Sequence, residues 1–154
     1  MSEKLKLKIM ICVPMRDRTD EEIKASIDEI RHFLIGDVMN DIADAPIGIE
    51  IEIIYTDNMV KYHCPVVAED GDAYGMFCLG NGFANVMSMC DYVAFAPGFL
   101  NSRGCLSEVI TAMLYNKPVI PFQYNYHTGD LELMSNEDLR MNLPSIINEK
   151  LNLK

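Results

Sequence analysis

The stretch 91–122, DYVAFAPGFLNSRGCLSEVITAMLYNKPVIPF, constrains the fold of this chain more than any other part of it. It contains an apolar strand (92–96), a Pro-Gly turn, a polar loop ending at Gly104, a helix carrying Glu108 in its first turn, and a second apolar strand (118–122). This succession predicts a βαβ unit with two buried parallel strands. Small molecules bind beyond the carboxyl ends of such strands, so the loop before the helix is a candidate binding loop.

The residues at the start of the predicted helix favour an anionic ligand. Ser102, Arg103 and Gly104 lie where free backbone N–H groups and the positive end of the helix dipole attract a phosphate or a carboxylate. Glu108 lies one turn further in, close enough to act on a molecule held there. An acidic residue in a first helical turn is more often only a partner of the dipole, and spacing alone leaves both interpretations open.

The beginning of the chain predicts a second loop on the same rim. Residues 5–13 (LKLKIMICV) change from alternating to fully apolar, as a central strand does, and Pro14 ends them. Met15, Arg16 and Arg18 belong to the polar loop that follows, and one of the arginines could hold an anion there. The next helix begins with the capping box Thr19 and Glu22. Its apolar face consists of Ile23, Ile27, Ile30 and Leu34.

Two middle segments predict an edge strand and an insertion. Residues 47–54 alternate isoleucine with glycine or glutamate, which is typical of a strand with one solvent-facing side. Residues 57–74 show no periodicity and predict either disorder or a lid over the binding loops. His63 and Cys64 within them lack a second ligand pair at a useful spacing, so we expect no metal site.

The remaining segments predict two helices and a loop. Apolar spacing indicates a helix over 76–90 with Asn81 and Asn85 on its polar side. The loop 123–130 carries aromatic side chains that either contact a ligand or neighbouring subunit or simply pack. A short helix follows, and Pro144 is expected to break it before a last turn. The apolar face of the 76–90 helix is predicted to be Met76, Leu79, Phe83, Val86, Met87 and Cys90.

Together these segments predict the α/β class. We expect one domain, residues 1–154, with a Rossmann-like (flavodoxin-like) parallel sheet of four to five strands flanked by helices on both faces. A chain of this length can bury a substantial core without disulfides or metals.

Composition excludes several partners. Because 23 acidic residues face 13 basic ones, for a net charge of −10, we expect neither a nucleic-acid polymer nor an anionic membrane as a partner. The five cysteines are odd in number and scattered, which favours reduced thiols in the cytoplasm. No apolar run is long enough to cross a bilayer, and the start MSEKLKLK lacks the apolar core of a signal peptide. We therefore expect a soluble, cytoplasmic protein.

The segment from Gly104 to Glu108 resembles the nucleophile motif of the nucleoside 2-deoxyribosyltransferase superfamily, in particular its 2'-deoxynucleoside 5'-phosphate N-hydrolase branch and small bacterial and phage members. Ser102 falls where that branch has a phosphate-binding serine. The segment CVPMR, which ends in Met15 and Arg16, is similar to the first-strand loop whose arginine faces the substrate. The resemblance extends from about residue 5 to 121, except for 37–77. Cytokinin-releasing phosphoribohydrolases share a similar motif.

This resemblance implies an enzyme that cleaves or transfers the N-glycosidic bond of a (deoxy)nucleoside or its 5'-monophosphate. Glu108 would attack C1' of the sugar, while Ser102, Arg103 and Gly104 with Arg16 would hold the phosphate. It implies no metal or organic cofactor, and a homo-oligomer in which a neighbouring subunit completes the site.

Two family features are absent. The aspartate that assists the leaving base falls at Phe83, and the glycine two residues after the nucleophile is Ile110. Asn81 or Asn85 could orient a base but not protonate it, and Asp72 or Glu69 could supply the missing carboxylate. The alternative is therefore a nucleotide-binding protein without catalysis, and a third interpretation is an oligomeric scaffold in which Glu108 only caps its helix.

Overall fold

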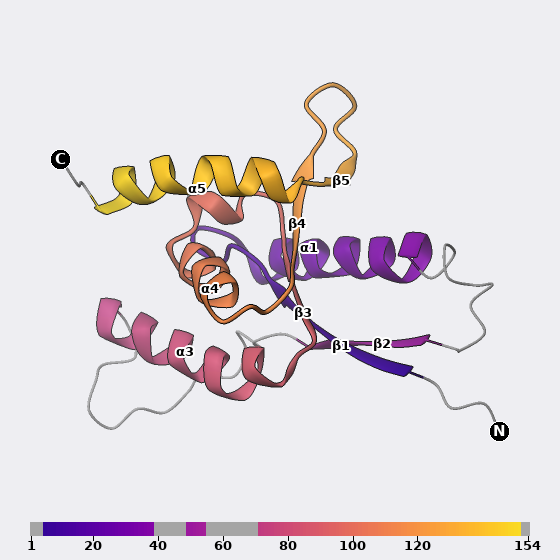
Figure 1. The fold of residues 1–154 in the computed structure, drawn as a ribbon, viewed down its shortest axis with the longest axis horizontal. Coiled ribbons are helices and arrows are strands. Elements are labelled where there is room, and N and C mark those ends of the chain that lie inside the picture. Colours follow the sequence, from indigo (N-terminus) through magenta and orange to yellow (C-terminus); the bar gives the residue numbers. More distant parts are fainter. Residues whose placement is uncertain (1–4, 39–48, 55–70, 152–154) are drawn as a thin grey trace.

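The computed structural model describes residues 5–38, 49–54 and 71–151. Figure 1 shows a central sheet with helices on both sides, which confirms the predicted α/β class. The strands are β1 (Leu5–Cys12), β2 (Ile49–Ile54), β3 (Tyr92–Phe95), β4 (Val119–Tyr124) and β5 (Leu131–Leu133). The α-helices are α1 (Asp20–Phe33), α3 (Gly71–Asn85), α4 (Arg103–Leu114) and α5 (Asn136–Leu151), and a π-helical turn (Leu34–Val38) extends α1.

The sheet has the order β2-β1-β3-β4-β5. The first four strands are parallel, β2 lies at the edge beside β1 as predicted, and only β5 is antiparallel. From β1 the chain proceeds first to β2 on one side and later to β3 on the other. The carboxyl ends of β1 and β3 therefore flank the topological switch point, where ligands bind in open α/β sheets.

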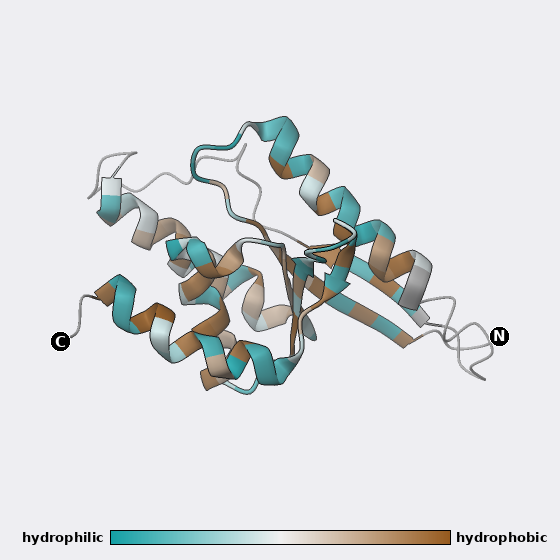
Figure 2. Ribbon diagram, turned by 90° about the horizontal axis from the view of Figure 1, so that it is seen from above, coloured by the Kyte–Doolittle hydropathy of each residue, from teal (hydrophilic) through white to brown (hydrophobic). Residues whose placement is uncertain are grey.

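Alternating side chains along the strands form two cores. Ile9 and Ile11 of β1 pack with α1, in a cluster that includes the predicted face Ile23, Ile27, Ile30 and Leu34. Met10 and Cys12 point the other way, into the cluster formed with α4 and α5. Figure 2 shows hydrophobic and hydrophilic residues alternating along the first half of β1, before the strand becomes fully apolar. The predicted capping box of α1 is confirmed, because the Thr19 side chain accepts from Glu22 N and the Glu22 side chain accepts from Thr19 N.

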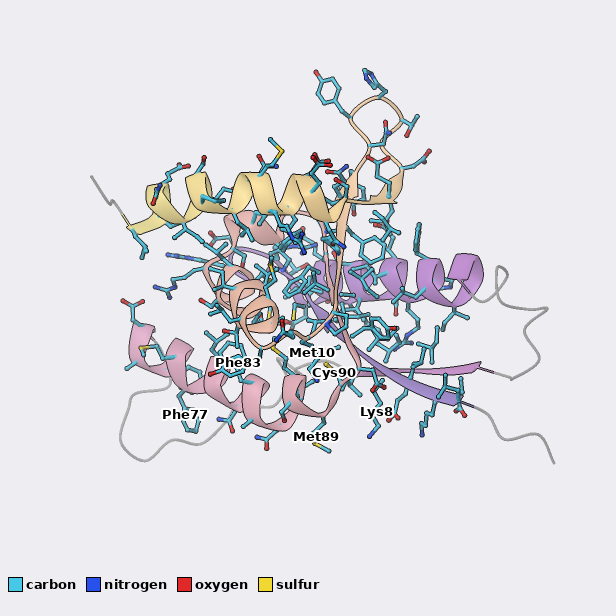
Figure 3. The ribbon with its side chains drawn as sticks, in the orientation of Figure 1. Lys8, Met10, Phe77, Phe83, Met89 and Cys90 are labelled. Carbon is cyan, nitrogen blue, oxygen red and sulfur yellow. The ribbon has the colours of Figure 1, made fainter. Side chains whose placement is uncertain are left out.

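Helix α3 differs from its prediction. It begins at Gly71, so the last residues of the segment predicted to be structureless form its first turn, and it ends at Asn85. Residues 55–70 lie outside the described residues, and with them the predicted lid and His63 and Cys64. Phe83 packs against the core, whereas Met76 is 75% exposed, so it is wrong to place Met76 on the buried face. In Figure 3, Phe83 is directed toward α4 and Phe77 away from it.

The end of the chain also departs from expectation. The loop predicted at 123–130 is confirmed over 125–130, where it joins β4 and β5 as a β-hairpin, but β4 continues to Tyr124. In the turn, the Asn125 side chain accepts from the backbone N–H groups of His127 and Thr128. Helix α5 runs through Pro144 without a break. Burial of Leu139 and Leu143, on the turn before the proline, compensates for the lost backbone donor.

Candidate active site

A cavity of about 800 Å³ opens at the carboxyl ends of β1 and β3. The loop after β1 and the start of α4 form its base, and residues of α3 and α5 form its walls. The cavity thus lies at the topological switch point. Its size is within the range of small-molecule sites.

Glu108 lines this cavity from the second turn of α4. The expectation that it lies in the first turn is wrong, because the helix begins earlier, at Arg103, with Ser102 as its N-cap. Glu108 is the sixth residue of the helix, so its carboxylate lies too far from the first turn to accept hydrogen bonds from the free N–H groups there. The structure therefore does not support the interpretation that Glu108 only interacts with the dipole of its helix.

The carboxylate of Glu108 is held by a thiol. Cys12 Sγ, at the end of β1, donates a hydrogen bond to Glu108 Oε2 over 3.1 Å. Burial raises the pKa of Glu108 from its ordinary 4.5 to about 7, and the hydrogen bond from Cys12 acts in the opposite direction. Glu108 therefore changes its charge near neutral pH, as groups in catalytic sites often do.

The neighbouring thiols are poor nucleophiles. Burial, reinforced by the charge of Glu108, raises the pKa of Cys12 far above its usual range and that of Cys105 to about 12. Both thiols keep their protons at neutral pH, and the thiolate is the reactive form. Of these three groups, the carboxylate of Glu108 is thus the one equipped to attack an electrophile.

The start of α4 presents backbone to the cavity. Ser102 Oγ accepts from Cys105 N over 3.4 Å, and the chain reaches this point through Gly98, whose φ of +86° suits glycine. Gly104 lines the cavity, and a Cβ built on it would meet no atom within 4 Å. A ligand can therefore approach the first turn of α4 closely, where free N–H groups favour an anion.

Among the residues that the structure describes, three cationic side chains line the cavity: Arg16 from the loop after β1, Arg103 from α4 and Lys150 from α5. In a chain of net charge −10 this is a local excess over the two carboxyl groups of the lining, Asp17 and Glu108. Arg16 and Lys150 have no hydrogen bond or ion pair to the described residues, which leaves them able to contact an anion.

The third cation is already paired. Arg103 Nη1 lies 2.8 Å from Asp72 Oδ1 of α3, in an exposed ion pair that connects α3 and α4 beside the cavity. Arg18 plays a structural part instead, because it donates to Pro14 O and to Ser26 Oγ and does not line the cavity.

The structure brings most of the predicted site residues together and leaves one apart. Asn81 does not line the cavity; its Nδ2 donates to Phe77 O within α3. Asn85 is exposed and donates to Asn81, and the aromatic residues of the β4–β5 hairpin also lie away from the cavity lining. The residues that do line it are Met15, Arg16, Ser102, Arg103, Gly104 and Glu108.

Sequence reasoning missed several side chains of the cavity, among them Cys12, Asp17 and Lys150. Cys12 was visible only as the end of an apolar strand and the first residue of the CVPMR segment, and Lys150 comes from a helix that was expected to break. Asp17 has a left-handed φ of 60°, a conformation that aspartate adopts more readily than most residues but that spacing does not reveal.

Two further observations concern other kinds of site. Across residues 5–38, 49–54 and 71–151, no three His, Cys, Asp or Glu side chains cluster as a metal ion would require. None of the helices in these parts of the chain combines the length and apolar character needed to cross a membrane.

Comparison with known proteins found no counterpart. No protein-family model matches the chain, and no curated protein or solved structure does. Function is therefore inferred from the fold and the cavity.

Proposed function

We propose that this protein cleaves the N-glycosidic bond of a (deoxy)nucleoside or its 5'-monophosphate, with Glu108 as the nucleophile. The observation that carries the proposal is the carboxylate of Glu108 in the cavity at the switch point, held by Cys12 at 3.1 Å. A carboxylate at that place, beside a helix N-terminus and several cations, fits a substrate with an anionic group and an electrophilic sugar carbon. The resemblance of Gly104 to Glu108 to a deoxyribosyltransferase nucleophile segment supports the same chemistry.

The reaction has two steps. An oxygen of ionised Glu108 forms a bond to C1' while the C1'–N bond breaks, and the base leaves with that electron pair and takes a proton from water. A water molecule, or a second base in a transferase, then attacks C1'. The ester bond to Glu108 breaks and the carboxylate is restored. In the hydrolytic case the proton that the attacking water loses neutralises the hydroxide left by the first step, so substrate and one water give free base and sugar.

Binding would place the sugar over the carboxylate. The free N–H group of Gly104, the hydroxyl of Ser102 and the side chains of Arg16 and Lys150 provide donors and positive charge for a 5'-phosphate. Arg103 can join them when it leaves Asp72. Fixing the phosphate orients C1' and converts the attack into an intramolecular step.

Nucleotide binding without turnover is a second candidate. One observation favours it: α3 lines the cavity with Gly75, Cys78, Leu79 and Gly82, and none of these supplies a carboxylic acid to protonate a leaving base. Phe83, at the position of the family aspartate, packs against the core instead. Such a protein would sequester nucleotides in the same cavity.

Self-association and a cytoplasmic location are part of the proposal. Met76 and Met89 are 75% and 61% exposed, and large apolar side chains on a surface often mark contacts between proteins. The four cysteines of the described residues are free thiols, which suits a reducing compartment.

Incubation with a panel of nucleosides and 5'-monophosphates, followed by chromatography for free base, tests the proposal. Wild type should release base, and Glu108→Gln, which keeps the shape and the acceptor for Cys12, should not. Tight binding of a nucleotide by wild type without release would support the second candidate. No binding and no release would contradict both.

A further inference from the structure

We propose that Cys12 is a positioning residue that holds the carboxylate of Glu108 in its attacking orientation. This inference rests on the proposed function, because it assigns Cys12 a part in the work of that same nucleophile. The contact that carries it is the hydrogen bond from Cys12 Sγ to Glu108 Oε2, which joins β1 to α4 across 96 positions of sequence.

The thiol is fixed by the centre of the sheet. Cys12 is only 3% exposed, it pairs with Phe95 of β3, and its carbonyl oxygen accepts from Ala96 N over 2.9 Å. Alternation along β1 points its side chain toward α4, whereas Ile11 and Val13 point toward α1. A donor on such a rigid strand can orient a carboxylate more accurately than one on a loop.

The contact also selects which oxygen reacts. Oε2 accepts the thiol hydrogen, while Oε1 has no hydrogen-bond partner among the described residues. Glu108 is half-buried and lines the cavity, so Oε1 is the oxygen left free to attack. The thiol thus immobilises one oxygen and leaves the other for chemistry.

Cys12 is the donor of this hydrogen bond because its thiol is a much weaker acid than the carboxyl group of Glu108. Burial and the charge of Glu108 hold the pKa of Cys12 well above its usual range, so the thiol keeps its proton over the whole range in which Glu108 titrates. A proton donor next to a carboxylate favours the ionised form, and here it opposes the effect of burial. Cys12 therefore increases the fraction of Glu108 that is ready to attack at neutral pH.

Other groups share the cavity and could also influence the charge of Glu108. They belong to several elements that line the cavity, so the test must separate their effect on the pKa of Glu108 from that of the thiol. These groups are Arg16 and Asp17 after β1, Cys78 of α3, Arg103 and Cys105 of α4, and Lys150 of α5.

The experiment measures the titration of Glu108 directly, by NMR of protein labelled at the glutamate side-chain carboxyl carbon. Glu108→Gln assigns the resonance. Cys12→Ala, which removes the donor, should raise the pKa of Glu108 by about half to one pH unit, the size expected for one hydrogen bond. In Cys12→Ser, whose hydroxyl is a stronger donor, the pKa of Glu108 should be equal to or lower than that of wild type. Cys90→Ala removes another thiol from the same core cluster, one that is bonded to Met87 O rather than to Glu108. It should leave the pKa of Glu108 unchanged.

The pH profile of kcat/KM for base release should move in parallel, and a merely structural cysteine would not cause that. An unchanged pKa of Glu108 in Cys12→Ala, or an equal change in Cys90→Ala, would overturn the inference. If Cys12→Ala does not fold, a higher pKa in Cys12→Ser than in wild type overturns it. The titration needs no substrate, so absence of base release in wild type refutes the proposed function and leaves this test intact.

Discussion

Replacing Glu108 by glutamine should change how the stability of the protein depends on pH. Burial raises the pKa of Glu108 from 4.5 to about 7, so the folded chain binds this proton more tightly than the unfolded chain does. The free energy of unfolding of wild type should therefore fall as the pH rises from about 4.5 to about 7 and stay lower above that. Below pH 4.5 the carboxyl group is protonated in both states and contributes no difference.

The size of the effect follows from the same values. A pKa difference of about 2.5 pH units corresponds to about 3 kcal/mol. Water in the open cavity screens the half-buried carboxylate, so we expect a loss of about 1 to 3 kcal/mol between about pH 5 and about pH 8. Glu108→Gln stays uncharged, still accepts from Cys12, and should not lose this stability.

Urea denaturation followed by circular dichroism measures the difference, since the chain has no tryptophan. The free energy of unfolding of Glu108→Gln minus that of wild type should increase with pH. Subtracting wild type cancels the titration of the three histidines, which both proteins share. Glu149→Gln, which removes an exposed carboxylate, controls for the change of net charge. A difference that is flat with pH, or equal in both variants, would refute the idea that Glu108 is held in a desolvated site.

Three further substitutions test the surroundings of Glu108. Asp72→Asn should release Arg103 and strengthen the binding of a nucleoside monophosphate up to about fivefold by calorimetry, the range of an exposed ion pair; weaker binding would contradict this. Gly104→Ala should stabilise α4 by about 0.5–1 kcal/mol in urea denaturation, yet it should weaken the binding of the same nucleoside monophosphate. Unchanged affinity would show that the ligand does not approach the backbone of Gly104. Pro144→Ala should raise the melting temperature by restoring a backbone donor within α5, and a lower one would mean that the proline is required.

Local signals in the sequence predicted the centre of the fold. The capping box at Thr19 and the spacing of four apolar residues define α1, and alternation along the isoleucines identifies β2 as an edge strand. The βαβ unit from β3 to β4 was readable because its strands are apolar throughout and its loop is polar. These features depend on neighbours in sequence, which spacing reports directly.

Errors arose where tertiary packing outweighs local preference. Pro144 should end a helix, yet α5 continues because Leu139 and Leu143 are buried against the core. The short strand β5 has three residues, too few for a period to be recognised, although Asn125 and Gly129 in its hairpin were signals of a turn. The start of α4 was placed too late, since Gly104, a weak helix former, lies in its first turn.

In the candidate site, too, local sequence signals predicted some parts, whereas others depend on contacts between distant residues. Both loops on its rim could be predicted, since the carboxyl ends of parallel strands meet at one edge. The contact between Cys12 and Glu108 could not, because it joins positions 96 residues apart. Lys150 could not be predicted either, as it reaches the cavity only when α5 is continuous.

The most direct test of the central claim is chromatographic detection of free base after wild type and Glu108→Ala are incubated separately with nucleosides and 5'-monophosphates. Release of base by wild type, abolished in the alanine variant, is the result that a glutamate nucleophile predicts. No release from any substrate, or equal release by the two proteins, would contradict the assignment of Glu108 as the nucleophile.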